Sequence, residues 1–335
     1  MPKVSIIVPI YNVEKYIEKC LRSLFEQTLD DIEYIFVNDC TPDNSMIILE
    51  KVLKKYPHRI KQVKIINHEH NQGQAGARTT GMKAMTGEYM IHCDPDDWIE
   101  LDMYEQMYNF AVSNNSDIVV CDLYHEYKQS SVKIDLYTTK TPKEIITSPE
   151  ALDTRWYLHC RLVRCKIITE YNIYPVKGIN LLEDMIILFK IYYHCNKLCY
   201  LQKPLYHYNR VNENAITTKT SDIKYILQQK EAIKQIEDFL ISKQLYNTLF
   251  FYHWKYFIKD KFLALKKNDY TNWRNTFPEI STAVKKDKQI NFIYRNIYNL
   301  AHKNLIFLFL FMLYRKISKI INFIYAKTFS NSTCL

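Results

Sequence analysis

The sequence predicts an α/β fold in which helices flank a doubly wound, mostly parallel central sheet. The first 125 residues alternate between short apolar runs and longer amphipathic stretches, a spacing typical of strand–helix–strand units. The apolar runs are continuous and rich in β-branched residues, as expected for parallel strands that are buried on both faces. Apolar residues make up 47% of the chain and charged residues 24%, which indicates a folded globular protein.

Five strands and four helices are expected in this alternating part. The strands are residues 4–11, 32–39, 62–67, 88–94 and 117–122, and the helices are residues 13–27, 43–56, 73–85 and 101–114. Asp43 is expected to cap the second helix, and Gly87 to end the third. In doubly wound sheets ligands bind at the carboxyl ends of the strands, so a site is expected there.

The pattern weakens after about residue 125. Residues 130–140 are compatible with a strand, residues 151–169 with a helix, and residues 180–195 with an amphipathic helix that buries one face. Two short strands are then expected at residues 198–201 and 205–210. This half therefore has a less regular order of elements than the first.

The C-terminal third differs from the rest of the chain in charge. Everything after Asp222 reads as helical, and residues 251–335 hold 15 Lys and Arg against 4 Asp and Glu, whereas the whole chain has a net charge of only +9. Such an imbalance predicts segments with different roles. We expect a first domain over residues 1–217, with halves 1–125 and 126–217, and a basic helical region over residues 218–335.

Composition excludes several kinds of site. The nine cysteines include no CxxC pair, which argues against zinc and thioredoxin-type redox sites and favours reduced thiols in a cytosolic protein. No GxxxxGK[ST] or GxGxxG motif occurs, so a P-loop and a Rossmann dinucleotide site are excluded. The N-terminal apolar run lacks a signal-peptide cleavage site and is too short to span a bilayer, so the protein is expected to begin in the cytosol.

Acidic residues crowd the end of the fourth predicted strand. The stretch "HCDPDDWIE" places Asp94, Asp96 and Asp97 there, and Asp39 closes the second strand. Each could be an ordinary loop residue, but carboxylates that end two strands on the same side of a sheet favour a site. Because crowded carboxylates repel each other, a divalent cation such as Mg²⁺ or Mn²⁺ would neutralise them, together with the charges of a pyrophosphate.

Four motifs in order resemble the catalytic domain of glycosyltransferase family 2, which has the GT-A fold. They are "PIYN" after the first strand, "NDCTPDNS" after the second, "NQGQAGARTTG" over the third helix and the Asp-x-Asp of "DPD". The resemblance covers roughly residues 3–215 and implies an inverting enzyme that moves a sugar from a nucleotide donor, usually a UDP-sugar, to an acceptor hydroxyl. Asn38 and Thr79 depart from the pattern, because the family commonly has a carboxylate and an asparagine there.

The resemblance places the nucleotide at the ends of the first two strands, in the half formed by residues 1–125. Asp39 would accept a hydrogen bond from the base, and Arg78 falls where the family keeps a basic residue near the nucleotide and diphosphate. The base and ribose would be lined by Pro9, Tyr11 and Asn12, with Glu14 just behind.

The same resemblance assigns roles to the crowded aspartates. Asp96 would be the principal ligand of Mg²⁺ or Mn²⁺, and Asp94 would contact the ribose and help to position the metal. Asp97 is in this family more often a structural partner than a ligand. Arg210, in "YHYNR", would cover the donor diphosphate or shape the acceptor pocket.

Inversion at the sugar needs one general base, which takes the proton of the attacking hydroxyl. In the family this base is often the Asp of an acidic pair that opens a helix, which here implies Asp184, with Glu183 as the alternate, in the half formed by residues 126–217. The competing explanation is an ordinary helix start, because carboxylates are favoured in a first helical turn.

Other functions fit the sequence less well than a transferase. A nucleotidyltransferase would need a Gly-rich N-terminal loop, which is missing, and no nucleic-acid-binding module is recognisable in the basic third. A non-catalytic sugar-nucleotide-binding partner of a glycan-assembly complex would keep the carboxylates without turnover. The favoured expectation is transfer to a glycan or lipid-linked acceptor in surface polysaccharide synthesis.

The last part of the chain suggests a contact with membrane. Nine apolar residues, 305–313, precede Arg315, Lys316, Lys319 and Lys327. Nine helical residues reach about 14 Å, far short of a bilayer core of about 30 Å, so a span is not expected. A helix lying at the surface of an anionic membrane fits this pattern, and a helix packed on the catalytic domain is the alternative. The expected location is the cytoplasm, either free or peripheral at the inner face of the cytoplasmic membrane.

Overall fold

The computed structural model describes residues 1–147, 156–212, 222–245, 248–263, 265 and 269–286, together with a few residues between 296 and 313. The chain divides into two compact units, residues 1–250 and residues 251–335, which are described separately. The first unit therefore extends past residue 217, where the sequence pattern had placed a boundary, and it includes helix α8 (Ile223–Ser242).

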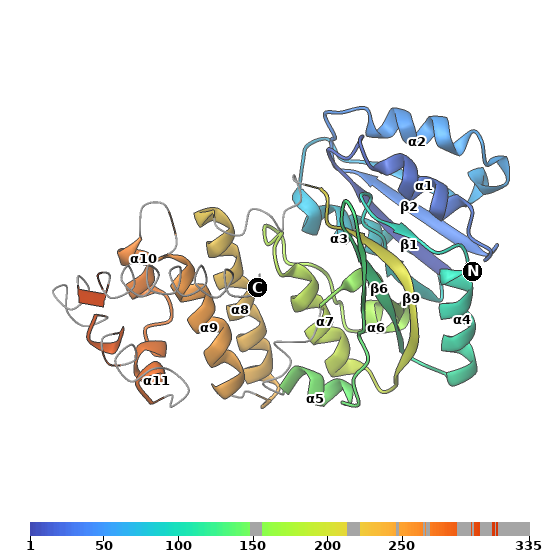
Figure 1. The fold of residues 1–335 in the computed structure, drawn as a ribbon. Helices are drawn as coiled ribbons and strands as arrows, with labels where there is room; N and C mark the ends of the chain where they lie inside the picture. The colour runs from blue at the N-terminus through green and yellow to red at the C-terminus, as the bar shows by residue number, and fades with distance from the viewer. Residues whose placement is uncertain are drawn as a thin grey trace, which may run out of the picture. The chain divides into compact units, whose positions relative to one another are not determined.

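The first unit is built on a mixed nine-stranded sheet, with the strand order β3-β2-β1-β4-β8-β6-β9-β5 and with β7 paired to β6 (Figure 1). Four of the five strands expected in residues 1–125 are parallel to one another: β1 (Val4–Ile10), β2 (Ile32–Asn38), β3 (Val63–Asn67) and β4 (Tyr89–His92). The fifth, expected at residues 117–122, is the first part of β6 (Ile118–Glu126). Every residue of β1 and β4 is buried, which explains their continuous apolar sequence.

The four helices of this half also lie where the sequence predicts them. They are α1 (Ile17–Phe25), α2 (Ser45–Leu53), α3 (Gly73–Ala84) and α4 (Met103–Asn114). Asp43 is not the N-cap of α2 that the sequence predicted: the cap is Asn44, and Asp43, one residue earlier, accepts the backbone N–H of Ser45 at 3.1 Å. The prediction for Gly87 is wrong: α3 already ends at Ala84. Gly87 instead lies against β1, where a Cβ atom would come within 2.9 Å of the backbone nitrogen of Ser5.

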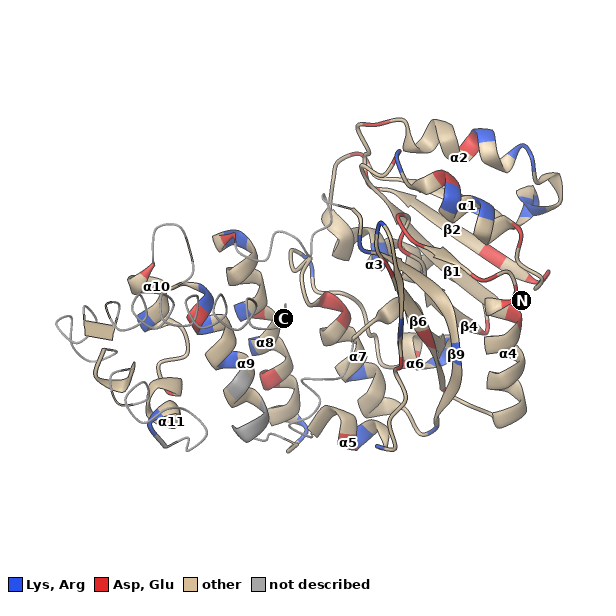
Figure 2. Ribbon diagram, in the orientation of Figure 1, with Lys and Arg blue, Asp and Glu red and all other residues tan. Residues whose placement is uncertain are grey.

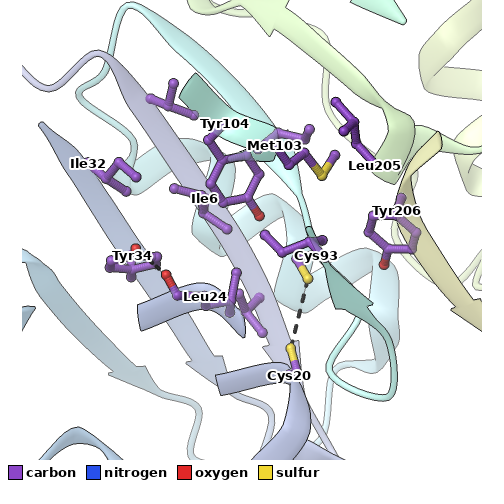
Figure 3. Packing of buried hydrophobic residues seen from close by; sticks show 14 of the residues in the cluster. Ile6, Cys20, Leu24, Ile32, Tyr34, Cys93, Met103, Tyr104, Leu205 and Tyr206 are labelled. Atoms are coloured by element: carbon purple, nitrogen blue, oxygen red, sulfur yellow. Dashed lines mark hydrogen bonds between the residues drawn. The ribbon is translucent and has the colours of Figure 1, made fainter. Parts of the chain in front are cut away.

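The core of this unit lies between α1, α4 and the sheet, as Figure 3 shows. Tyr34 of β2 is fully buried and donates its hydroxyl to the carbonyl of Leu24 at 2.5 Å. Cys20 of α1 and Cys93, just after β4, bring their sulfur atoms to 3.8 Å in the same core. The cysteines of the described residues are free thiols, in line with the expectation of reduced cysteines.

The helix expected over residues 151–169 is a wrong prediction. Residues 148–155 lie outside the described part, and the rest forms a short 3-10 turn (Leu158–Cys160), strand β8 (Arg161–Arg164) and helix α6 (Cys165–Glu170). β8 lies antiparallel between β4 and β6 (Ile118–Glu126), in the middle of the sheet. A four-residue strand buried on both faces shows no alternation, so its apolar run cannot be told from a helical one.

The two short strands expected at 198–201 and 205–210 are one strand, β9 (Leu198–Asn209). It runs parallel to β6, with register shifts on either side of Asp122. The remaining elements of the first unit are β5 (Trp98–Ile99), β7 (Ser131–Ile134), α5 (Pro142–Thr147) and α7 (Glu183–His194). β5 pairs antiparallel with β9, so the segment that follows β4 lies beside the end of β9.

The described C-terminal residues are helical, as predicted. They form α9 (Thr248–Lys261), α10 (Tyr270–Asn275) and α11 (Ile280–Lys286). Of residues 305–327, only three are described, so the surface helix expected there lies outside the described residues. Among the described helices, none combines the length and the apolar character that crossing a bilayer would need.

Candidate active site

The carboxyl ends of β1, β2 and β4 lie next to each other, and the polar residues predicted from the sequence follow them. Ile10 pairs with Asn38, and Ile7 pairs with His92, so β1 ends between the other two strands. Asp39 comes directly after β2, and Asp94 comes two residues after β4. The parallel topology therefore places these carboxylates along one edge of the sheet.

Asp39 is buried and binds the start of α3. Its Oδ1 accepts the backbone N–H of Gln72 at 2.8 Å and lies 2.7 Å from Nδ1 of His68, while Oδ2 accepts the backbone N–H of Gly73 at 2.8 Å. A carboxylate oxygen accepts two hydrogen bonds, so Oδ2 keeps room for one further donor. Gly73 has φ +77°, a conformation that suits glycine.

The residues that follow β1 form a turn beside Asp39. Tyr11 is 47% exposed, so its ring is accessible to a ligand. Asn12 has φ 55° and donates its backbone N–H to the Thr41 hydroxyl at 2.8 Å, and Glu14 accepts the backbone N–H of Asn44 at 3.1 Å. Pro9 does not follow the strand, as the sequence reading supposed: it is a buried residue within β1. Its ring is therefore packed within the sheet.

Arg78 of α3 joins three carboxylates that are far apart in the sequence. It is 1% exposed. Its Nη2 donates to Oδ1 of Asp94 at 2.9 Å, and its Nη1 donates to Oε1 of Glu183 at 2.8 Å and to Oδ1 of Asp184. We call these four residues the Arg78 cluster. A buried guanidinium is tolerated when its donors meet charged acceptors in this way.

The acidic pair at the start of α7 differs in exposure. The side chain of Asp184 is 23% exposed, whereas that of Glu183 is 6% exposed. Figure 2 marks acidic residues at this end of α7. Leu182, just before the pair, has φ 64° in the left-handed region, which is costly for a residue with a branched side chain. The backbone is thus held in a strained turn where the two carboxylates begin.

A nearby asparagine holds this turn in place. Oδ1 of Asn180 accepts the backbone N–H of Ala75 at 3.0 Å, and the backbone N–H of Asn180 donates to Oε1 of Gln228 at 2.9 Å. The turn is therefore tied to α3 on one side and to α8 on the other. This explains how Leu182 keeps its unfavourable conformation.

The charges of the cluster move its pKa values in opposite directions. Burial and the neighbouring charge of Asp184 raise the pKa of Glu183 to about 8, and burial also raises the pKa of Asp184. Burial works in the same direction on Asp94, but the charge of Arg78 outweighs it and holds the pKa of Asp94 below its usual range. At neutral pH the cluster therefore combines an ionised Asp94 with a protonated Glu183.

The side chains of Asp96 and Asp97 have different hydrogen-bond partners. Oδ2 of Asp96 accepts the side-chain amide of Asn212 at 2.7 Å. Asp97 is buried, and its oxygens accept the Tyr206 hydroxyl at 2.6 Å and the backbone N–H of Asn209 at 2.7 Å. Burial first, and then the charge of Asp94, raise the pKa of Asp96.

The Asp96 side chain also lines a hollow of about 370 Å³. The other residues of its wall come from α1 and its approach, from β5 and from the end of β9: Lys15, Tyr16, Glu18, Lys19, Arg22, Trp98 and Asn209. Figure 2 shows the basic residues along α1. The hollow thus gives Asp96 access to a ligand, and Asp97 is the buried partner that holds the segment in place.

The donor set around Asp94 fits a divalent cation. One oxygen of Asp94, one of Asp97 and one ring nitrogen of His159 all lie within 4.8 Å of one another. Neither ring nitrogen of His159 has a hydrogen-bond partner among the described residues. His159 was missed in the sequence, because it falls in the segment that was expected to be a helix and no spacing marks it.

Arg210 is not part of the Arg78 cluster. It is exposed just after β9, where its backbone N–H donates to the carbonyl of Glu126 at 2.9 Å and its guanidinium lies 5.4 Å from the centre of the Tyr208 ring. His207 lies 2.7 Å from Oε1 of Glu126 and 2.9 Å from Oε1 of Glu100, as a hydrogen-bonded residue would.

Known proteins resemble this chain over the part that holds the Arg78 cluster and the strand ends. The family "Glycosyl transferase family 2" matches residues 5–168. The chain is 37% identical over 230 residues to the uncharacterized glycosyltransferase EpsJ of Bacillus subtilis (strain 168), a match that covers 65% of this chain and 63% of EpsJ. The chain thus spans less than two thirds of the length of that relative.

Two further proteins are similar over most of this chain. The minor teichoic acid biosynthesis protein GgaB of Bacillus subtilis (strain 168) is 27% identical over 315 residues, which are 84% of this chain and 32% of GgaB. The crystal structure of S. aureus TarS 1–349 in complex with UDP-GlcNAc superimposes with a TM-score of 0.68 at 20% identity, over 90% of this chain and 89% of that one. At this identity the likeness shows the fold.

Proposed function

Because residues 5–168 belong to glycosyl transferase family 2, we propose that the chain is an inverting, metal-dependent glycosyltransferase. It moves a sugar from a nucleotide-diphosphate donor, a UDP-sugar, to a hydroxyl of a glycan or lipid-linked acceptor in surface polysaccharide synthesis. The observation that carries the proposal is the Arg78 cluster, in which Asp184 and Asp94 meet at one guanidinium beside the strand ends. A non-catalytic binding partner would have no need of this arrangement.

The donor nucleotide binds at the ends of β1 and β2. The accessible ring of Tyr11 stacks on the base, and Oδ2 of Asp39 takes the one hydrogen bond that its other partners leave open. Asn12 and Glu14 hold the turn that carries Tyr11. The complex of TarS with UDP-GlcNAc, a protein of the same fold, supports a uridine nucleotide.

Asp94 and Asp96 would hold Mg²⁺ or Mn²⁺, which would neutralise the diphosphate as it leaves. Asp94 suits this role because it stays ionised next to Arg78, and Asp96 because it faces the hollow. Asp97, which follows Asp96, anchors this segment to β9 through Tyr206 and Asn209.

Asp184 acts as the general base. As the acceptor oxygen attacks the anomeric carbon, Asp184 takes the hydroxyl proton, and the bond between that carbon and the diphosphate breaks. Its partial exposure favours it over Glu183, which is more deeply buried and whose pKa burial raises to about 8. Arg78 orients the carboxylate through Oδ1.

The acceptor belongs to the cell surface in this proposal. GgaB is named for minor teichoic acid biosynthesis, which supports a polymer of the cell envelope as the acceptor. The basic C-terminal region, with its excess of Lys and Arg, would keep the enzyme at the inner face of the cytoplasmic membrane. A screen of UDP-, GDP- and dTDP-sugars with Mn²⁺, scored by nucleotide release, tests the donor.

The assignment of the base is tested by Asp184→Asn. This variant should bind donor normally and turn over roughly 10²–10⁴-fold more slowly, the usual contribution of a positioned base. Donor affinity is measured by calorimetry and turnover by nucleotide release in the presence of acceptor. Normal turnover in Asp184→Asn, with a large loss in Glu183→Gln, would move the base by one residue.

The role of Asp96 is tested by Asp96→Asn. The variant should lose most of its activity and its donor affinity, because a cation ligand is removed, while its unfolding midpoint stays unchanged, because the side chain faces the hollow. Asp122→Asn, at a buried aspartate of β6 outside this donor set, is the matched control: it should weaken the ion pair with Lys133 and leave donor affinity unchanged. Full activity of Asp96→Asn in the presence of a chelator would contradict the metal role.

A further inference from the structure

We propose that His159 supplies an imidazole nitrogen to the cation that Asp94 binds. The metal centre would then carry a nitrogen ligand in addition to carboxylate oxygens. This inference rests on the proposed function, because it needs a cation at Asp94.

The first observation is that the His159 ring is buried without a hydrogen bond within the described part of the chain, with the Asp94 carboxylate 3.6 Å from its Nδ1. The residue is 2% exposed, and neither Nδ1 nor Nε2 has a hydrogen-bond partner among the described residues. Leaving a buried polar group unpaired costs about 1–3 kcal/mol, so such groups call for an explanation. The rings of His68 and His207 show the ordinary case, because both of their nitrogens lie within hydrogen-bond distance of protein oxygens.

The second observation is the direction of the ring. Nδ1 of His159 lies 3.6 Å from Oδ2 of Asp94, which is too long for a hydrogen bond. The other oxygen of Asp94, Oδ1, is taken by Arg78. Two ligand atoms that are each about 2.1 Å from one ion lie about 3.0 Å apart at a right angle and about 4.2 Å apart when opposite. The observed separation falls within this range.

The third observation is that Tyr206 contacts His159, Asp94 and Asp97. The His159 ring lies 4.2 Å from the ring of Tyr206, with only 21° between the two planes. The Tyr206 hydroxyl accepts the backbone N–H of Asp94 at 3.2 Å and donates to Oδ2 of Asp97 at 2.6 Å. The ring and the two acidic residues are therefore fixed relative to one another, as a metal centre needs.

A mixed ligand set has a chemical consequence. Imidazole suits transition ions such as Zn²⁺ and Fe²⁺, whereas Mg²⁺ prefers oxygen ligands, and Mn²⁺ is also bound by carboxylates. A site with both kinds of ligand should therefore prefer Mn²⁺ to Mg²⁺. Removing the nitrogen should weaken Mn²⁺ binding more than Mg²⁺ binding.

His92 is the natural comparison for this test. It ends β4, two residues before Asp94, it is 1% exposed, and neither of its ring nitrogens has a partner among the described residues. It therefore shares the burial of His159, but it does not belong to the group of ligand atoms around Asp94. A substitution to Phe at either position keeps an aromatic ring and removes both nitrogens.

The experiment uses the full chain with Mn²⁺ and pyrophosphate, which contains no nitrogen, and records pulsed electron paramagnetic resonance. The ¹⁴N modulation of a bound imidazole is expected in the unsubstituted protein and in His92→Phe, and it should be absent in His159→Phe. Mn²⁺ affinity, measured by titration, should fall about 10–100-fold in His159→Phe, the size of effect that metal-site neighbours have. The affinity for Mg²⁺ should change less.

Labelling with ¹⁵N-histidine gives the same answer without a variant at position 159. The ¹⁴N modulation should change to that of ¹⁵N in the unsubstituted protein and in His92→Phe, so the inference stays testable if His159→Phe fails to fold. Bound Mn²⁺ without an imidazole signal, or a signal lost in His92→Phe, would overturn the inference and leave the proposed transferase standing. An absence of Mn²⁺ binding would overturn the metal dependence as well.

Discussion

Arg59 and Arg78 are both buried arginines of the first unit, but their guanidinium groups meet different partners. Arg59 lies in the 3-10 helix η1 (Pro57–Gln62) and donates to backbone carbonyls at the end of α1 and just after it, those of Phe25, Gln27 and Leu29. The carboxylate of Asp30 also lies 3.9 Å from Nη1 of Arg59, but that side chain is 96% exposed. Arg78 donates instead to the carboxylates of Asp94, Glu183 and Asp184. Arg59 thus stabilises the backbone around the end of α1, whereas Arg78 holds three carboxylates close together.

The difference lies in what the partners can do. A backbone carbonyl is a fixed dipole that neither titrates nor exchanges its partner, so the Arg59 contacts only stabilise the fold. Carboxylates can gain protons or bind a cation, and three of them exceed the single charge of Arg78. A buried arginine surrounded by carboxylates therefore indicates a functional site, whereas one that binds mainly carbonyls indicates a structural contact.

The largest expected effect is that of Arg78→Met. Removing one partner of a buried ionic network costs about 3–5 kcal/mol, because the other charges stay buried without compensation. Turnover should also fall by roughly 10²-fold or more, since the carboxylates lose their orientation. Urea denaturation and nucleotide release measure the two effects.

Arg59→Met is the matched control for Arg78→Met. It should lower the free energy of unfolding, because the carbonyls it binds lose their donor, while turnover per folded molecule stays the same. A variant Arg59→Met with impaired turnover, or Arg78→Met with normal turnover, would break the distinction between the two arginines.

An intermediate effect is expected from pH, through Glu183. Its folded-state pKa of about 8 is well above the usual value near 4.3, so between these values the folded chain binds more protons than the unfolded chain. The free energy of unfolding should therefore fall as the pH rises through this window. Glu183→Gln should flatten this dependence and be the more stable protein at pH 8.5.

Urea midpoints recorded from about pH 5 to pH 8.5 test this expectation, because the window of the effect lies between the two pKa values. Glu50→Gln, at an exposed glutamate of α2, is the matched control and should leave the pH dependence unchanged. Equal slopes for the unsubstituted protein and Glu183→Gln would mean that Glu183 is ionised in the folded state.

The smallest expected effect concerns Leu182→Gly. Glycine relieves the strain of φ 64°, which is about 1–2 kcal/mol, but it adds about 0.5–1 kcal/mol of unfolded-state entropy, so stability should rise by no more than about 1.5 kcal/mol. Turnover should fall several-fold with the donor KM unchanged, because a looser turn holds Asp184 less firmly. Asn172→Gly, at φ 52° after α6, is the control and should leave turnover unaltered.

Many of the elements in residues 1–125 follow from the local pattern of apolar residues. β1, β2 and β4 are predicted to within two residues, because buried parallel strands need continuous apolar runs and the chain has few other runs of that kind. The positions of Asp39 and Asp94 follow from this, since parallel topology alone brings the carboxyl ends of strands to one edge. The acidic pair that opens α7 was visible in the sequence as well, but only as one of two explanations.

The tertiary structure decided which of these residues meet. Arg78 lies more than 100 residues from Glu183 and Asp184, and no periodicity relates them: the contact exists because the turn before α7 is bonded to α3 through Asn180. β8 and His159 escaped prediction for a related reason. A short segment buried on both sides takes its conformation from its neighbours, here β4 and β6, since hydrogen bonds to those strands outweigh its weak local preference.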